Sequence, residues 1–189
     1  LTSYMALPFA PDLARGVLHE LAELQGRTVD PQSGEEPGKI VHELRSHGGA
    51  GPFSECSRYY GTVDATPLYV LVAADAVRWG AVTTADRAWL LPAVDAAIGW
   101  IRDAGDSNGD GFVDYVPHDG GLTNQGWKDS WDGVRHLDGT VAVPPIALCE
   151  VQGYVYAAHR GRAALARAFG EPDAAVRGHE QRAELLRRR

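Results

Sequence analysis

Segments with helical periodicity alternate along this chain with two long connections that have none. In the periodic segments apolar residues recur every three or four positions, which is the spacing of one helix face. These segments are 13–24, 67–79, 86–103, 144–169 and the stretch from 172 toward the C-terminus. The connections 27–52 and 105–143 are rich in Gly, Pro and polar residues, and only 39–44 resembles a short strand. The pattern predicts a mainly α fold whose long loops gather on one face and carry the function.

Proline and threonine positions predict where the helices begin. Pro67 falls in the first turn of the second segment, and Thr84 is placed to cap the third. Pro144 and Pro145 are expected to open the fourth. Pro92 lies inside the third segment and predicts a kink there.

The predicted helices are apolar on their flanks as well as along one stripe, as in Leu68–Ala74 and Ala93–Ile101. Helices of this kind need neighbours on several sides. A chain of 189 residues has the size of one ordinary domain or of a piece of a larger one. We expect residues 1–189 to form a single incomplete domain of a larger helical array. Its exposed apolar flanks would then promote self-association.

Charge and composition exclude several classes of partner. The chain has 18 Lys and Arg against 25 Asp and Glu, a formal charge of −7, which disfavours nucleic-acid binding. It has no apolar run of the roughly 20 residues that a membrane-spanning helix needs, so we expect no membrane partner. Its first residues lack the basic start of a signal peptide. Cys56 and Cys149 are far apart, so we expect reduced, buried thiols and a cytoplasmic protein.

The loop 120–139, GGLTNQGWKDSWDGVRHLDG, carries the most unusual chemistry. Trp127 and Trp131 flank Asp129. A carboxyl group pressed between indole rings is poorly solvated and retains its proton more readily. A protonated carboxylic acid beside flat apolar rings is what a glycoside hydrolase uses as its general acid, and the rings can stack on a sugar. The alternative is a structural loop whose aspartates cap turns and whose tryptophans fill the core.

Two further clusters lie at predicted helix starts. Tyr60 and Asp64 precede the second helix and suit a polyhydroxyl ligand, although Asp64 could instead cap the helix. Glu150 and Gln152 begin the fourth helix among apolar neighbours. A glutamate there needs a ligand or a partner such as Arg160.

The stretch 106–114, DSNGDGFVD, matches the first nine positions of a calcium loop. Its candidate ligands are Asp106, Asn108, Asp110 and Asp114. The twelfth position is Pro117 instead of glutamate, so a full EF-hand is not expected. Two interpretations stay open: a shorter calcium site, or a tight turn stabilised by its own side chains. No cofactor is otherwise expected, because the sequence has no HExxH, GxSxG, Walker or GxGxxG motif.

Four motifs in order resemble one family. They are YYGTVDATPLYV (59–70), DGFVDY (110–115), NQGWKDSWDG (124–133) and EVQGYVYAA (150–158). Together they resemble the bacterial amylo-alpha-1,6-glucosidase, or glycogen-debranching-like, proteins among the six-hairpin (α/α)6-barrel glycosidases. The resemblance covers nearly the whole chain. It implies inverting hydrolysis of an α-glucosidic bond, in an oligosaccharide or small glucoside, within a toroid of helix hairpins.

The resemblance also implies roles for single residues. Asp129 resembles the general acid, with Asp132 as the fallback. The residues expected to bind the sugar are Tyr60, Asp64, Asn124, Gln125, Trp127, Trp131, Glu150 and Gln152. The resemblance implies that the general base is a carboxylate C-terminal to residues 1–189. It also implies that these residues form about half of the barrel. We therefore expect these residues alone to be inactive or nearly so.

Three alternatives stay open. The chain could be a carbohydrate-binding or scaffold protein of helix hairpins without catalysis. It could be a calcium-stabilised helical interaction module. It could also be a glycosidase of another small glucoside, such as trehalose or a glucosylglycerate-like compound.

Overall fold

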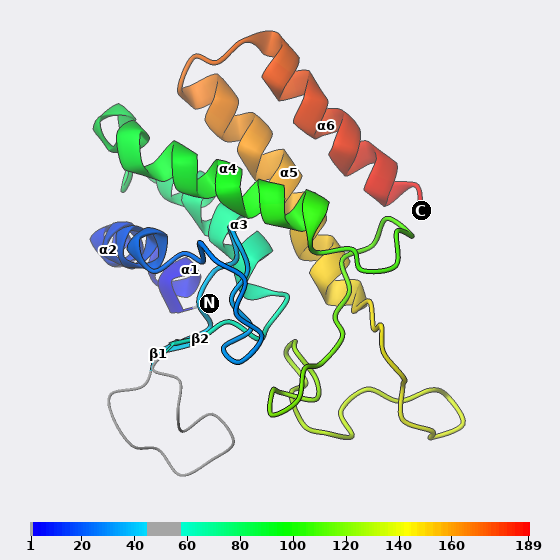
Figure 1. Ribbon diagram of the computed structural model, residues 1–189. Helices are drawn as coiled ribbons and strands as arrows, with labels where there is room; N and C mark the ends of the chain where they lie inside the picture. Colours follow the sequence, from blue (N-terminus) through cyan, green and yellow to red (C-terminus); the bar gives the residue numbers. More distant parts are fainter. Residues whose placement is uncertain (1, 45–57) are drawn as a thin grey trace.

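The computed structural model describes residues 2–44 and 58–189, and these are mainly helical (Figure 1). The helices are α1 (Thr2–Ala6), α2 (Pro11–Glu23), α3 (Ala65–Arg78), α4 (Arg87–Asp103), α5 (Cys149–Ala168) and α6 (Asp173–Arg187). A 3-10 turn, η1 (Thr84–Asp86), leads into α4. The strands β1 (Glu43–Leu44) and β2 (Arg58–Tyr59) form one short antiparallel pair. The mainly α class predicted from the sequence is confirmed.

Helix α3 lies at the centre of the packing. It contacts α1, α2, α4 and α5, and α5 in turn packs along α6. Eight of the fourteen α3 residues are buried, which an amphipathic surface helix could not achieve. The expectation that this apolar segment needs neighbours on several sides is therefore confirmed.

Helices α3 and α5 approach closely at Gly161. A Cβ atom added to Gly161 would lie 3.0 Å from the Cβ of Ala74 and 3.4 Å from the carbonyl oxygen of Val70. The missing side chain lets the two helix backbones approach this closely. Ala73 of α3 and Ala158 of α5 are also small and fully buried.

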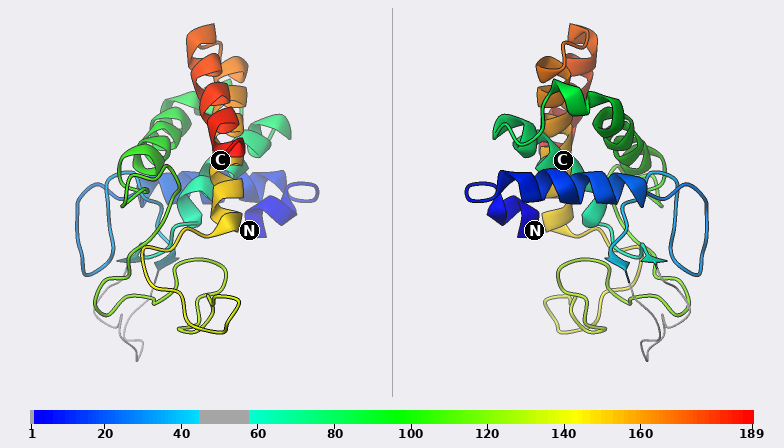
Figure 2. Two further views of the ribbon diagram at one scale, coloured as in Figure 1. Left: turned by 90° about the vertical axis from the view of Figure 1, so that its right-hand side faces the viewer. Right: turned by 90° about the vertical axis from the view of Figure 1, so that its left-hand side faces the viewer.

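Both long connections lie at one end of the helical body. Residues 24–44, 58–64 and 104–148 lie at the end where α3 and α5 begin, as Figures 1 and 2 show. Short connections, 79–86 and 169–172, join α3 to α4 and α5 to α6. This arrangement confirms that the long loops share one face.

The start of the fourth predicted helix is wrong by several residues. Helix α5 begins at Cys149, and Pro144 and Pro145, joined by a cis bond, lie in a bend before it. Ile146 explains the difference, because it pairs with Tyr115 through two backbone hydrogen bonds of 3.1 and 3.2 Å. A residue held in a β-bridge cannot also begin a helix, so the prolines end the loop instead.

Other predicted boundaries need smaller corrections. Thr83, and not Thr84, caps the turn before α4, by accepting from the backbone N–H of Ala85. Helix α4 continues past Pro92 to Asp103 without a break in its assignment. Of the possible strand 39–44, only the last two residues pair.

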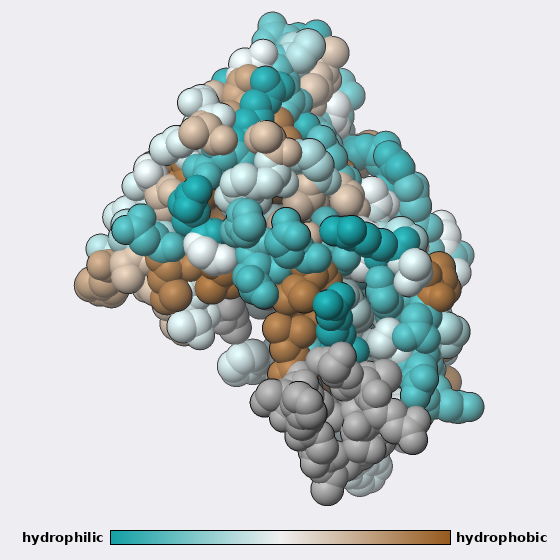
Figure 3. Space-filling model, turned by 60° about the vertical axis from the view of Figure 1, so that its left-hand side comes forward, coloured by the Kyte–Doolittle hydropathy of each residue, from teal (hydrophilic) through white to brown (hydrophobic). Residues whose placement is uncertain are grey.

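Apolar side chains are exposed on α1 and α2. In the view that brings this side forward, hydrophobic groups lie among hydrophilic ones (Figure 3). The exposed apolar residues of this region are Tyr4, Met5, Phe9 and Leu13. They agree with the expectation of apolar surface left uncovered, whereas self-association stays a prediction.

The structure bears on two expectations from the sequence, the burial of the cysteines and the absence of a membrane-spanning helix. Cys149 is exposed, so its predicted burial is wrong, and Cys56 lies outside the described residues. Within residues 2–44 and 58–189, no helix has the length and apolar character needed to cross a membrane.

A buried carboxylate ties α2 to the start of α4. Asp86 is 4% exposed and accepts hydrogen bonds from the Arg15 guanidinium at 2.6 and 3.0 Å. It also accepts from the Trp89 indole at 3.2 Å and from the backbone N–H of Thr83 at 3.0 Å. These bonds favour the charged form and lower the pKa of Asp86 to about 2, with the Arg15 hydrogen bond as the largest cause.

We predict that Asp86→Asn destabilises the fold at pH 7 by about 2 kcal/mol, because it removes charge-assisted bonds at a buried site. The pKa of Asp86 is lower when folded than when unfolded. The contribution of Asp86 to the free energy of unfolding is therefore complete above the pKa that it has in the unfolded chain, and it is lost as the pH falls toward 2. Chemical denaturation across this pH range measures both effects. The control is Asp103→Asn, whose exposed pair with Arg102 should matter little. Equal stability of Asp86→Asn and wild type at pH 7 would contradict the prediction.

Candidate functional site

A pocket of about 470 Å³ opens beside the start of α3. Its polar part is formed by His42, Asp64, Trp127 and Asp129, which come from three segments of the chain. Its apolar part is lined by side chains of α2 and α3 and by residues 40–41. We call this cavity the Asp129 pocket. It brings together three of the residues that the sequence singled out: Asp64, Trp127 and Asp129.

Asp64 faces the pocket because it does not cap its helix. It occupies the N-cap position of α3, yet its side chain makes no capping hydrogen bond. The alternative of a purely capping aspartate is therefore not what the structure shows. Burial raises the pKa of Asp64, and the nearby His42 opposes this effect only in part. The carboxyl group therefore holds its proton to a higher pH than an exposed aspartate does.

Trp127 and Asp129 lie on the outer side of the same pocket. Asp129 is exposed, and the side chains of Trp127 and Trp131 are 74% and 68% exposed. The enclosure of the Asp129 carboxyl between two indole rings, expected from the sequence, is absent. The indole of Trp127 instead presents an open apolar surface next to a carboxylate. This is the arrangement that a sugar ring could cover.

Hydrogen bonds of the buried Asn124 hold the turn that carries Trp127 and Asp129. Asn124 is 2% exposed, accepts a hydrogen bond of 2.7 Å from the Tyr115 hydroxyl, and donates to the carbonyl of Ser130. The neighbouring backbone is held as well, since the N–H of Val63 donates to the carbonyl of Gln125 at 2.9 Å. The predicted sugar contact of Asn124 is thus replaced by a supporting role, which orients residues 126–130.

Gly126 allows the turn to lie against the start of α5. A Cβ atom added there would lie 2.3 Å from a methyl carbon of Leu148 and 3.8 Å from a carboxylate oxygen of Glu150. Glu150, which is half-buried, therefore lies next to the turn, although it does not line the Asp129 pocket. Its position leaves it available to a ligand that extends along the turn.

Gln152 forms hydrogen bonds to the backbone of Val113 and Leu148 and does not line the Asp129 pocket. Its amide nitrogen donates to the carbonyls of Val113 and Leu148, at 2.7 and 3.2 Å. Its amide oxygen accepts from the backbone N–H of Val113 at 3.0 Å. The side chain thereby fastens the loop around residue 113 onto α5, and the structure assigns it no place in the pocket.

Tyr60, Gln125 and Trp131 also lie outside the Asp129 pocket. Tyr60 is 1% exposed, and its hydroxyl donates to the carbonyl of Leu24 at 2.6 Å. Gln125 is buried and lines a different pocket. Trp131 is exposed on the loop and lines neither. Of the predicted sugar contacts, only Asp64 and Trp127 line the Asp129 pocket.

Asp132 has a different environment from Asp129. It accepts a hydrogen bond of 2.7 Å from Arg135, and this bond lowers the pKa of Asp132. A carboxylate held in the charged form by a guanidinium is a poor proton donor. Asp132 also does not line the Asp129 pocket.

The calcium-like stretch uses its side chains to hold its own backbone. Asp106 accepts from the backbone N–H groups of Gly109, Asp110 and Gly111 at 2.7 to 3.1 Å. The remaining candidate ligands, Asn108, Asp110 and Asp114, likewise accept from nearby backbone N–H groups. In the described part of the chain, no group of three or more His, Cys, Asp or Glu residues is arranged to hold a metal ion. These bonds are those of a tight turn, and calcium binding stays a prediction.

Sequence reasoning missed His42 and Tyr69. His42 follows a buried stretch in a connection without periodicity, and its backbone N–H donates to the carbonyl of Tyr59 at 2.8 Å. Tyr69 lies one helical turn into α3, and its hydroxyl donates to the carbonyl of Leu18 at 3.3 Å. Both line the Asp129 pocket.

Comparison with models of protein families finds no match for this chain, and neither does a search of curated proteins. The functional interpretation therefore depends on the geometry of the pocket and on the motifs described above.

We predict that Asn124→Ala loosens the turn at residues 126–130. The substitution leaves the Tyr115 hydroxyl and the Ser130 carbonyl without their partner, at a cost of about 1–3 kcal/mol. Hydrogen exchange should become faster at the backbone amides of this turn and stay unchanged in α6. The control is Asn108→Ala, in an exposed turn far from the pocket. Unchanged exchange at the turn would show that Asn124 does not hold it.

We predict that Asp64→Asn leaves the protein at least as stable at pH 7. Burial raises the pKa of Asp64 above its unfolded value. Its effect on stability is therefore most favourable below the unfolded pKa and is lost as the pH rises through the folded pKa. The amide has no charge to bury, so melting temperatures of the variant and wild type should diverge only as the pH rises. A lower melting temperature for Asp64→Asn at pH 7 would contradict this.

Proposed function

We propose that this chain contributes to the hydrolysis of α-glucosidic bonds, with Asp129 as general acid in the Asp129 pocket. The observation that carries the proposal is that Asp64 lines one cavity together with Trp127 and Asp129, which lie far from it in the sequence. A carboxyl group can act as the general acid of a glycosidase, and an indole surface can stack on a sugar ring. The resemblance to glycogen-debranching-like proteins points to the same reaction.

Asp129 is suited to protonate the leaving oxygen of a bound glucoside. Its carboxyl is exposed at the pocket and, unlike that of Asp132, is not engaged by an arginine. A sugar ring stacked on Trp127 would exclude water from this carboxyl.

Asp64 would orient the sugar. Its carboxyl lines the pocket and can accept hydrogen bonds from sugar hydroxyl groups. His42 lies in the same pocket and offers a second polar contact. Together they would fix the glucosyl unit relative to Asp129, which is the positioning that makes a general acid effective.

An inverting mechanism needs a second carboxylate that activates water. The two carboxyl groups of such enzymes lie about 6.5–9.5 Å apart. We adopt for the base the position that the resemblance implies, C-terminal to these residues. Asp129 would then act as acid on one side of the sugar ring while the base directs water to the other.

We also propose that the helices belong to an (α/α)6 toroid. Two observations support this: α5 and α6 form a hairpin, and the long loops lie at one end where α3 and α5 begin. The exposed apolar residues of α1 and α2 are also what neighbouring hairpins would cover.

A second candidate is carbohydrate binding without hydrolysis. The exposed indoles of Trp127 and Trp131 favour it, because aromatic surfaces bind sugars without any catalytic group. It differs from the first proposal in what Asp129 does, since binding alone requires no proton donor.

We predict that Asp129→Asn abolishes glucose release from an α-glucoside, by about 10²- to 10⁴-fold. The assay uses the chain within its complete reading frame and a panel of glycogen limit dextrin, isomaltose, panose, trehalose and glucosylglycerate. The matched control is Asp132→Asn, three residues along the same loop, which should retain most activity. Equal loss in both variants, or full activity of Asp129→Asn, would contradict the assignment. Saccharide binding with no release by the wild type would favour the second candidate.

A further inference from the structure

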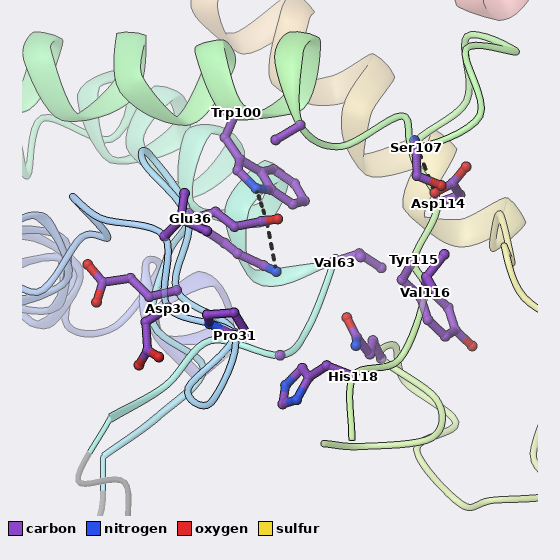
Figure 4. A pocket seen from close by; sticks show the side chains of 17 residues that line it. Asp30, Pro31, Glu36, Val63, Trp100, Ser107, Asp114, Tyr115, Val116 and His118 are labelled. Atoms are coloured by element: carbon purple, nitrogen blue, oxygen red, sulfur yellow. Dashed lines mark hydrogen bonds and ion pairs between the residues drawn. The ribbon is translucent and has the colours of Figure 1, made fainter. Parts of the chain in front are cut away.

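A second pocket, of about 290 Å³, lies between the loop 29–39, the end of α4 and the segment 104–118 (Figure 4). Nothing in the proposed reaction uses it. Its size is at the lower limit for small-molecule sites, so any ligand must be small. We call it the Lys39 pocket, after the cation that lies in its wall.

Lys39 is unusually enclosed for a lysine. Its side chain is 8% exposed and its ammonium lies 3.1 Å from a carboxylate oxygen of Glu36. The same ammonium lies 5.3 Å from the centre of the Trp100 ring, whose N–H donates to Glu36 at 2.7 Å. An ammonium has three hydrogens to donate, and one carboxylate oxygen does not satisfy them all.

Two acceptors that line the same pocket have no donor. Asp114 is 4% exposed, and one of its carboxylate oxygens accepts from the backbone N–H of Ser107 at 3.2 Å, whereas the other has no partner. His118 has its Nδ1 3.1 Å from the carbonyl oxygen of Asp119, which can only accept. Nδ1 therefore carries the proton, and Nε2, which is buried without a partner, is an acceptor in the neutral ring.

The pocket thus combines a buried ammonium, paired with one carboxylate oxygen, with two acceptor atoms that have no donor. An inorganic anion would bond to Lys39 but would be repelled by Glu36 and Asp114. A simple cation would suit the carboxylates but not the ammonium. Hydroxyl groups both donate and accept, and they carry no charge.

We infer that the Lys39 pocket binds a small neutral polyol, of the size of one sugar ring or less, through Lys39, Asp114 and His118. This site is separate from the Asp129 pocket, and the inference does not depend on the proposed reaction. Buried water molecules would satisfy the same groups, so water is the competing occupant.

The two pockets share a wall. Lys39 and Gln125 line one pocket, while the adjacent residues Ile40 and Gly126 line the other. The wall is fastened by the hydrogen bond from Val63 to Gln125. A test must therefore separate the two cavities.

The experiment is a titration of the isotope-labelled chain with D-glucose and with glycerol, followed by amide NMR spectra. We expect saturable shifts at the backbone amides of Ser107 and Val116. Methylammonium and inorganic phosphate serve as charged probes and should not reproduce them. Asp114→Asn and Lys39→Met should each weaken polyol binding at least about tenfold. Asp129→Asn, which changes only the other pocket, should leave these shifts unchanged.

Three results would overturn the inference. The first is the absence of saturable shifts at Ser107 and Val116 in the wild type, which would leave water as the occupant. The second is that the charged probes bind there and the polyols do not. The third is that well-folded Asp114→Asn and Lys39→Met proteins bind the polyols as the wild type does. If either variant fails to fold, the wild-type titration alone decides.

Discussion

The close contact between α3 and α5 is the constraint on which the rest of the molecule depends. Gly161 removes the one side chain that would hold the two helices apart, and Ala74 faces it from α3. With the helices in contact, Asp64 at the start of α3 and Glu150 in the first turn of α5 come to the same end of the body. The two long loops begin and end there, so the polar groups that they carry can converge.

The loops are positioned by specific bonds that compensate for their lack of regular structure. The bridge between Tyr115 and Ile146 joins both ends of the second loop, and Gln152 fastens that loop to α5. The bond from Val63 to Gln125 ties it to the start of α3. Each bond satisfies backbone groups that would otherwise be buried without partners. The result is one wall with a pocket on each side.

Periodicity was enough to predict helices α2 to α6, because apolar residues at helical spacing can be buried in few other ways, but it did not indicate the short helix α1. It could not predict the start of α5. Two prolines suit a helix start and a bend equally well, and the distant Tyr115 decides between them. The motif around Asp129 contributes Trp127 and Asp129 to the lining of a pocket. The sequence could not show that Trp127 would be open to solvent, since that depends on how the turn folds.

The remaining site residues show the limit of local patterns. Lys39 and His42 lie in a connection without periodicity, and their pockets are formed by residues far away in the sequence. Gln152 stands in a motif that suggests substrate contact, yet its hydrogen bonds support a loop. Residue type and spacing indicated which segments matter, whereas the role of each side chain followed from its partners.

We propose that a glucosyl unit binds in the Asp129 pocket, with the carboxyl of Asp129 next to the scissile oxygen. A crystal structure of the Asp129→Asn protein with panose tests this proposal most directly. We expect a sugar ring against Trp127, hydrogen bonds to Asp64, and the amide of residue 129 beside a glycosidic oxygen. A saccharide bound elsewhere on the molecule, with the Asp129 pocket empty, would contradict it.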